Sequence, residues 1–227
     1  MKQLLLDLNA HAPPALETFV TGQNGELLAL LGRVAHGAVN GLGERFIYLW
    51  GEAGAGKSHL LHALGSLEGA IYLDGAADEA ALAFRPDVRL YLLDDVADLS
   101  PASQIAAFTL FNQVREHGGV LVAAGPQPPA SLTVREDLRT RLGWGLIYQV
   151  HGLTDAEKIA ALEHAAAARG LSLSPGVLPY LMTHFRRDMP SLTAMLDALD
   201  RYSLETKRPI TLPLLKDLIL HDELGPV

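Results

Sequence analysis

Residues 51–59 read GEAGAGKSH, and this short stretch decides how the rest of the chain is interpreted. It fits the pattern G-x-x-x-x-G-K-S/T through Gly51, Gly56, Lys57 and Ser58. The apolar run RFIYLWG leads directly into it, and the amphipathic run KSHLLHALGSL continues from it. A strand before the loop and a helix after it are the context that the pattern requires. The stretch therefore predicts a phosphate-binding loop.

Each residue type in this loop has a physical part in holding phosphates. Glycines let backbone N–H groups turn inward around phosphate oxygens, and the start of the following helix adds partial positive charge. We expect Lys57 to reach the β- and γ-phosphates and Ser58 to ligate Mg²⁺. The predicted cofactors are ADP or ATP with Mg²⁺. The predicted nucleotide contacts in the loop are Gly51, Glu52, Ala53, Gly54, Ala55, Gly56, Lys57, Ser58 and His59.

A pair of acids follows a second apolar run, LYLLDDV at residues 90–96. One carboxylate at such a strand end can hold Mg²⁺ through water while its neighbour polarises the attacking water. We assign the metal role to Asp94 together with Ser58, and we treat Asp94 and Asp95 as candidate catalytic residues. A strand that ends in acids is common by itself, so the assignment depends on the phosphate loop upstream.

Apolar runs alternate with glycine-rich turns and helical segments from residue 45 onward. The runs contain Leu, Val, Ile and Tyr without polar alternation, which is typical of strands buried on both faces. The fold class is therefore α/β, a P-loop domain whose parallel five-stranded sheet is flanked by helices. The predicted strands lie in RFIYLWG, AIYLDG, VRLYLLDDV, GGVLVAAG and LIYQV.

The chain changes character after residue 152, where helical periodicity replaces the strands. Thr154, Ser174 and Thr211 are start signals for helices in this part. Residues 153–227 are thus expected to form a small all-helical domain, and residues 16–152 the α/β domain. The Pro-containing stretch NAHAPPA predicts a linker, so residues 1–15 form a flexible N-terminal segment.

Composition excludes several classes of function. Asp and Glu total 26 against 18 Lys and Arg, a formal charge of −8, which disfavours sequence-specific DNA binding by the chain itself. There are no cysteines, as suits a reducing compartment. The sequence has neither a secretion signal nor a run of ~20 apolar residues. We expect a cytoplasmic protein that does not enter membranes.

At this point the residues resemble the AAA+ module of the DnaA family of bacterial replication initiators and, within it, the short Hda-type regulators. The resemblance covers nearly the whole chain from residue 16. It implies an AAA+ nucleotide-binding domain followed by a helical lid domain. The segments that carry it are ETFVTGQN, FIYLWGEAGAGKSHLLHAL, LYLLDDV, PQPP and LRTRLGWGLIYQV.

The resemblance gives Arg141, in TRLGWG, the role of an arginine finger that reaches the nucleotide of a neighbouring subunit. A guanidinium suits the charge that builds on the γ-phosphate during transfer. Without the resemblance, a solvated arginine on a helix would be the preferred explanation. The resemblance also implies that Phe19 and Val20 lie near the adenine, although core packing explains them almost as well.

The opening stretch QLLLDL resembles the hexapeptide that docks into the replicative sliding clamp. Extended peptides of this kind bury alternate side chains in pockets while a Gln makes polar contacts. The expected partner-binding residues are Gln3, Leu4, Leu6 and Leu8, and the expected partner is the DNA polymerase III β sliding clamp. The alternative is a short strand folded onto the core.

Two prolines depart from the family pattern. Pro126 stands where the family places a polar residue that senses the γ-phosphate, and Pro190 stands at the position of the lid arginine. Arg186 and Arg187 lie near Pro190 but out of phase. These departures predict nucleotide binding with weak hydrolysis.

The preferred function is therefore regulation of replication initiation. The protein would bind the DNA-loaded clamp, present Arg141 to DnaA and stimulate hydrolysis of DnaA-bound ATP, acting mainly as an activator in trans. The chain ends soon after its lid, which favours an Hda-type protein over a DnaA with its DNA-binding domain. Only the resemblance points to DnaA.

Two rival functions stay open. One is a stand-alone ATPase, such as a helicase loader or remodelling motor, which would use Asp94 and Asp95 in a homo-oligomer. The other is a clamp adaptor whose nucleotide site merely stabilises the fold.

Overall fold

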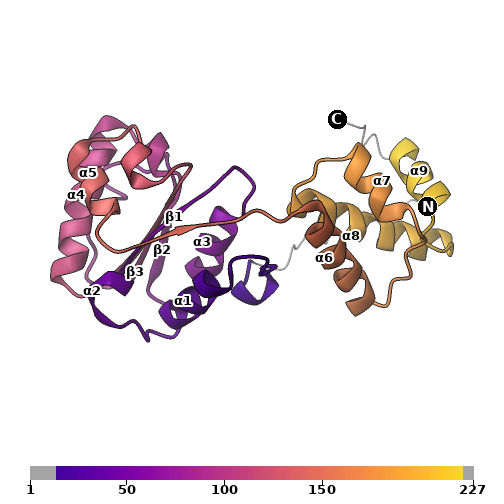
Figure 1. The fold of residues 1–227 in the computed structure, drawn as a ribbon, viewed down its shortest axis with the longest axis horizontal. Coiled ribbons are helices and arrows are strands. Elements are labelled where there is room, and N and C mark those ends of the chain that lie inside the picture. Colours follow the sequence, from indigo (N-terminus) through magenta and orange to yellow (C-terminus); the bar gives the residue numbers. More distant parts are fainter. Residues whose placement is uncertain (1–13, 222–227) are drawn as a thin grey trace, which may run out of the picture. The chain divides into compact units, whose positions relative to one another are not determined.

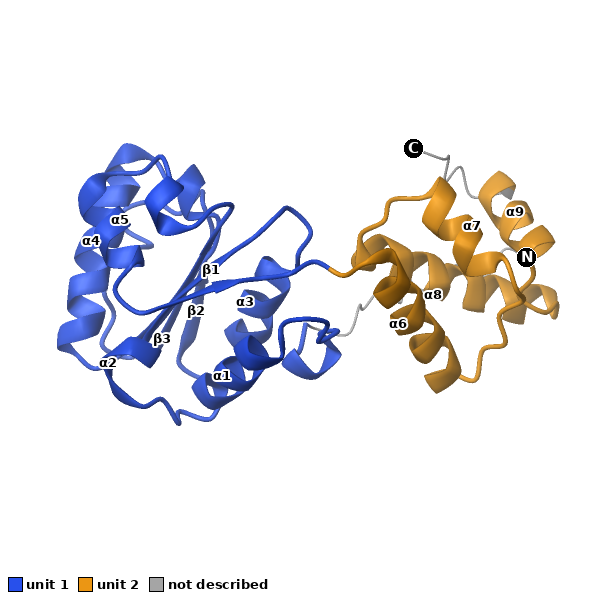
Figure 2. Ribbon diagram, viewed as in Figure 1, with its two compact units in different colours: residues 1–152 blue, residues 153–227 orange. Residues whose placement is uncertain are grey.

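The computed structural model describes residues 14–221, and the chain divides into two compact units, residues 1–152 and residues 153–227 (Figure 2). The expected clamp-binding residues Gln3, Leu4, Leu6 and Leu8 lie outside the described residues. Within the described part, no helix has the length and apolar character needed to cross a bilayer.

The first unit is built on a five-stranded sheet in which every paired strand is parallel, as the sequence predicts. The strand order is β2-β3-β4-β1-β5. The strands are β1 (Phe46–Trp50), β2 (Ala70–Leu73), β3 (Leu90–Leu93), β4 (Val120–Gly125) and β5 (Leu146–Gln149).

Both faces of the sheet are covered, which explains why the strand sequences do not alternate. Phe46 and Tyr48 of β1 join one apolar cluster, and Ile47 and Leu49 join the other, because successive side chains of a strand point to opposite faces. Figure 1 shows the helices of the first cluster on one side of the sheet and those of the second on the other. They are α4 (Pro101–Glu116) and α5 (Glu136–Leu142) on one side, and α1 (Gly25–Ala35) and α3 (Lys57–Gly65) on the other.

Short elements connect these layers. The 3-10 helix η1 (Leu16–Thr18) precedes α1, and α2 (Gly41–Glu44) leads into β1. Two further 3-10 helices, η2 (Val96–Asp98) and η3 (Pro129–Ser131), follow β3 and β4.

The second unit is helical and has its own apolar core. Thr154 begins α6 as predicted, because its hydroxyl accepts from the N–H of Glu157 while the Glu157 carboxylate accepts from the N–H of Thr154. Thr211 lies directly before α9, also as predicted. The helices of this unit are α6 (Asp155–Ala168), α7 (Val177–His184), α8 (Met189–Thr206) and α9 (Leu212–His221).

The predicted helix start at Ser174 is wrong. Helix α7 begins at Val177, and its N-cap is Gly176, with a φ of 94°. A residue at this positive φ turns the chain into the helix, and only glycine adopts it without strain. The Ser174 carbonyl instead accepts from the N–H of Val177, so Ser174 closes the turn before the helix.

Candidate functional site

The predicted phosphate loop leaves the end of β1 and enters α3, and its glycines are required by its shape. Gly56, the N-cap of α3, has a φ of 102°, and a Cβ placed there would lie 2.6 Å from Cε2 of Phe19. A Cβ on Gly51 would lie 2.5 Å from the carbonyl oxygen of Val150. Side chains at these positions would strain or displace the backbone, so the glycines keep the loop closed against its neighbours.

Lys57 lies across this loop. Its Nζ atom donates to the carbonyl oxygens of Gly51, at 2.8 Å, and Glu52, at 2.9 Å. The residue is only 8% exposed, and burial lowers the pKa of its ammonium, while the charges of Asp95 and Asp94 act in the opposite direction. The loop therefore holds a cation at its centre.

The residues of the loop fit a phosphate group. The first N–H groups of α3, those of Lys57, Ser58 and His59, have no intrahelical acceptor. No backbone hydrogen bond within residues 14–221 satisfies them either. The free N–H groups and the ammonium are donors suited to phosphate oxygens, and the oxygen of the exposed Ser58 hydroxyl can ligate a magnesium ion.

The acid pair follows β3, as predicted, and its two members have different surroundings. Asp94 is 1% exposed. Its Oδ2 accepts from the Tyr72 hydroxyl and its Oδ1 from the N–H of Asp95, both at 2.9 Å. Its own N–H donates to the carbonyl of Leu73 on the neighbouring strand. Asp94 is therefore a buried carboxylate with a fixed orientation.

Asp95 is the exposed member and has a left-handed backbone, with a φ of 45°. Partial burial of its carboxyl is the main cause that raises its pKa, and the charges of Asp94 and Asp98 add to it, while Lys57 lowers it. The two motifs follow the last residues of β1 and β3, which both pair in parallel with β4, so they lie at the same end of the sheet.

The segment before α1 covers the start of α3. The ring of Phe19 contacts Gly56 and lies 5.8 Å from the imidazole of His59, measured between ring centroids. The Nε2 atom of His59 is 3.3 Å from the carbonyl oxygen of Ala15. Phe19 also packs against the apolar cluster under the loop, and the half-buried Val20 follows it. Phe19 thus joins the core and borders the loop.

The sequence reasoning missed Asn24, which is 2% exposed. Its amide nitrogen donates to the carbonyl of His151 at 2.9 Å, and its amide oxygen accepts from the N–H of His151 at 2.8 Å. This double hydrogen bond fastens the start of α1 to the chain after β5, next to Val150, which closes against Gly51. The only sequence signal was an asparagine before a helix.

Arg141 lies in the last turn of α5 and is held by three side chains. Its Nε atom donates to Oδ1 of Asn112 at 3.0 Å, and its Cζ atom lies 4.0 Å and 4.8 Å from the ring centroids of Trp144 and Phe108. No carboxylate of residues 14–221 forms an ion pair with it. The guanidinium is therefore positioned without being neutralised.

The predicted finger lies near the amino ends of the strands, whereas the predicted loop lies at their carboxyl ends. Trp144 packs edge-on against Phe46, the first residue of β1, whereas the loop follows Trp50, the last. The parallel register Ile47↔Leu146 places the start of β5 beside the start of β1. The length of β1, about 13 Å at ~3.3 Å per residue, separates these two ends of the sheet. Arg141 therefore lies at the end of the sheet that is away from the loop of its own chain.

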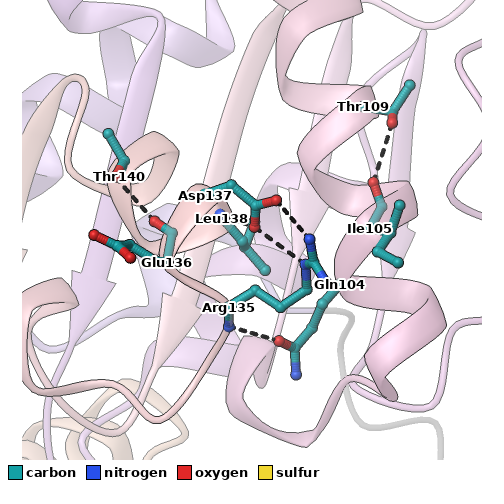
Figure 3. A network of polar contacts seen from close by, with 8 residues as sticks. All are labelled: Gln104, Ile105, Thr109, Arg135, Glu136, Asp137, Leu138 and Thr140. Carbon is teal, nitrogen blue, oxygen red and sulfur yellow. Dashed lines mark hydrogen bonds and ion pairs between the residues drawn. The ribbon is translucent and has the colours of Figure 1, made fainter.

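A polar network at the other end of α5 fixes this helix to α4 (Figure 3). The buried Gln104 accepts from the N–H of Arg135 at 2.8 Å through its side-chain oxygen and donates to the carbonyl of Leu99. The side chain of Arg135 pairs with Asp137 at 2.8 Å. Both ends of α5 are thus anchored on α4.

The two prolines lie after a strand and at the start of a helix. Pro126 follows β4 and is exposed, beside Gly125, which faces the Tyr48 hydroxyl. Pro190 lies in the first turn of α8, which Asp188 caps through the N–H of Ser191. Arg186 and Arg187 lie outside this helix, and their side chains pair with Asp188 and Asp155.

Comparisons with known proteins agree with this architecture. The family described as "Hda, lid domain" matches residues 155–219. A Haemophilus influenzae protein described as uncharacterized is 34% identical over 231 residues, which cover 96% of this chain and 98% of that protein.

Solved structures show the same fold. Domain III of the Thermotoga maritima replication initiation protein DnaA has a TM-score of 0.68 at 22% identity, covering 92% of this chain and 95% of that chain. A replication initiator DnaA bound to AMPPCP and single-stranded DNA has a TM-score of 0.67 at 24% identity and covers 82% of this chain. The present chain spans 64% of the length of that second DnaA chain.

The sheet, the loop and the helical unit together have the AAA+ fold that the DnaA structures share. The chain belongs to the same family as the Haemophilus influenzae protein, and the match of residues 155–219 to the Hda lid domain makes it an Hda-like, DnaA-related AAA+ protein.

Proposed function

We propose that this protein regulates the initiation of chromosomal replication by stimulating hydrolysis of ATP bound to DnaA. The observation that carries the proposal is the position of Arg141. Its charge has no ion-pair partner among the described residues, and it lies near the amino ends of the strands, away from the phosphate loop of the same chain. A guanidinium in that place can act only on a nucleotide held by another molecule, where it stabilises the charge that develops on the γ-phosphate. DnaA would thereby be converted to its inactive ADP form.

The loop of this protein would hold ADP or ATP with Mg²⁺. Lys57 and the free N–H groups of α3 would bind the phosphates, and Ser58 and Asp94 would hold the ion, which supplies charge neutralisation when bound. Phe19 and Val20 would border the adenine. The DnaA structures that share this fold, determined with AMPPCP, support a nucleotide here.

Hydrolysis by this chain itself would be weak. A proline ring at position 126 cannot orient water, and Pro190 carries no charge. Arg186 and Arg187 are engaged with acids of their own unit. The nucleotide would therefore serve to hold the active conformation, and the reaction would occur on DnaA.

The DNA polymerase III β sliding clamp would be the second partner. The alternate leucines Leu4, Leu6 and Leu8, with Gln3 before them, fit a pocket that takes an extended peptide. Binding there would bring the protein to DNA that has just been replicated.

The test is to preload purified DnaA with radiolabelled ATP and to follow conversion to ADP after adding this protein, with and without clamp loaded on DNA. We expect clamp-dependent acceleration. The proposal fails if the label is converted at the same rate in all mixtures.

A stand-alone ATPase is favoured by one observation, the retention of both acids beside Lys57. This candidate predicts brisk turnover by the protein alone, formation of a homo-oligomer, and loss of turnover in Asp95→Asn. Weak turnover in the absence of DnaA would exclude it.

A further inference from the structure

Asp94 is oriented by a tyrosine of the neighbouring strand. Tyr72 of β2 pairs in register with Leu92 of β3, so the side chains of Tyr72, Leu92 and Asp94 share one face of the sheet. The tyrosine ring extends diagonally along β3, and its hydroxyl donates to Oδ2 of Asp94 at 2.9 Å. A one-residue change of register would turn the hydroxyl to the opposite face.

The ring of Tyr72 is itself held from the phosphate-loop helix. The imidazole of His62, on α3, stacks on it with ring centroids 4.1 Å apart and an interplanar angle of 22°. The helix that begins at Lys57 and the strand that ends at Asp94 are thus joined through one tyrosine.

The Asp94 carboxylate has acceptor positions left for a further partner. An ionised carboxylate offers about four acceptor positions. The Tyr72 hydroxyl and the Asp95 N–H each use one, on different oxygens, and these two bonds fix the carboxylate plane. A phenol has an ordinary pKa of about 10, so the Tyr72 hydroxyl is a donor at neutral pH.

We propose that Tyr72, supported by His62, is a positioning residue for magnesium: it holds the Asp94 carboxylate in the orientation that receives the hydrated ion. The inference rests on the proposed function in that the loop must bind a nucleotide with Mg²⁺. Partners that orient a metal-facing carboxylate commonly change metal affinity by about 10- to 100-fold when removed.

The experiment measures affinity for a fluorescent ADP as MgCl₂ is titrated, starting from EDTA. Tyr72→Phe removes only the hydroxyl. We expect the Mg²⁺ concentration at half-effect to rise about tenfold, with the affinity in EDTA unchanged. His62→Ala, at an exposed position, should raise the Mg²⁺ concentration at half-effect by a smaller factor. This variant provides the test if Tyr72→Phe does not fold.

Tyr91→Phe is the matched control, because its buried hydroxyl bonds to the backbone of Arg85 rather than to an acid. Its Mg²⁺ curve should coincide with that of the wild type. Coincident curves for Tyr72→Phe, His62→Ala and wild type, beside a shifted curve for Asp94→Asn, would overturn the inference and leave the proposed function standing. Absence of ADP binding by the wild type would overturn both.

Discussion

The guanidinium of Arg141 lies on the indole ring of Trp144, with Cζ 4.0 Å from the ring centroid. An aromatic ring holds a cation by its quadrupole and dispersion, without supplying a negative charge. Asn112 adds one neutral hydrogen bond. Arg141 is therefore kept in a defined place while its charge stays available for an anion on another molecule.

Trp144→Leu tests this arrangement. Leucine keeps apolar contact with Phe46 but removes the ring under the guanidinium, so stimulation of DnaA ATP hydrolysis should fall about tenfold, a loss of ~1.4 kcal/mol of transition-state stabilisation. Affinity of the protein for ADP, measured by fluorescence titration, should not change. Arg115→Ala is the matched control, since Arg115 contacts the same ring at 4.7 Å and its loss leaves Arg141 in place. Equal stimulation by Trp144→Leu and wild type would contradict the positioning role.

Lys57→Ala should lower affinity for ADP by about 10- to 100-fold, since a hydrogen bond to a charged group contributes roughly 1.5–3 kcal/mol. The measurement is fluorescence titration with labelled ADP. Arg89→Ala, an exposed cation just before β3, is the control and should bind as the wild type does. If Lys57→Ala lost affinity yet stimulated DnaA fully, the clamp-adaptor alternative would gain support.

Gly56→Ala should both destabilise the first unit and weaken ADP binding. The left-handed backbone costs about 1–2 kcal/mol for alanine, and the new Cβ would meet the Phe19 ring at 2.6 Å. Chemical denaturation and ADP titration provide the two readouts. Gly118→Ala is the matched control, because its φ is 81° but no atom lies within 4 Å of the added Cβ. Gly118→Ala should lower stability only, and a loss of ADP affinity there would show that the effect is not local.

Asp95→Asn should raise thermal stability at pH 7. The raised pKa of Asp95 means that the folded protein binds this proton more tightly than the unfolded chain, so stability falls as pH rises above the ordinary value of 3.8 and through the folded pKa. Asparagine removes this loss and tolerates the left-handed backbone. The advantage should shrink as the pH falls toward 3.8. Thermal melts across pH provide the measurement.

Asp137→Asn is the control of opposite sign. The side-chain hydrogen bond from Arg135 holds the pKa of Asp137 below its usual value, so its contribution to stability is present above the ordinary pKa and is lost as the pH falls through the folded pKa. This variant should melt lower than the wild type at pH 7 and approach it in acid. A pH-independent difference for either variant would show that titration is not the cause.

The sequence predicts those features that depend on neighbours along the chain. The unbroken apolar run at residues 46–50 indicates a strand covered on both faces, and the loop and acid motifs mark the ends of two strands. The helix start at Thr154 can be predicted because its capping partner is only three residues away. The helix start predicted at Ser174 is wrong because α7 begins after Gly176, an N-cap whose positive φ has no clear sequence signature.

Features that depend on strand register were not predicted. The bond from Tyr72 to Asp94 exists only because Tyr72 pairs with Leu92, which no local pattern specifies. The contact between Trp144 and Arg141 needs the ordered last turn of α5. Asn24 reaches a backbone group 127 positions away.

The most direct test of the central claim is a single-turnover measurement of ATP hydrolysis on DnaA, with the sliding clamp loaded on DNA and this protein added as wild type, Arg141→Ala or Arg139→Ala. The account predicts acceleration by wild type and by Arg139→Ala, and a loss of roughly a thousandfold for Arg141→Ala. Acceleration by Arg141→Ala equal to that of the wild type would contradict it.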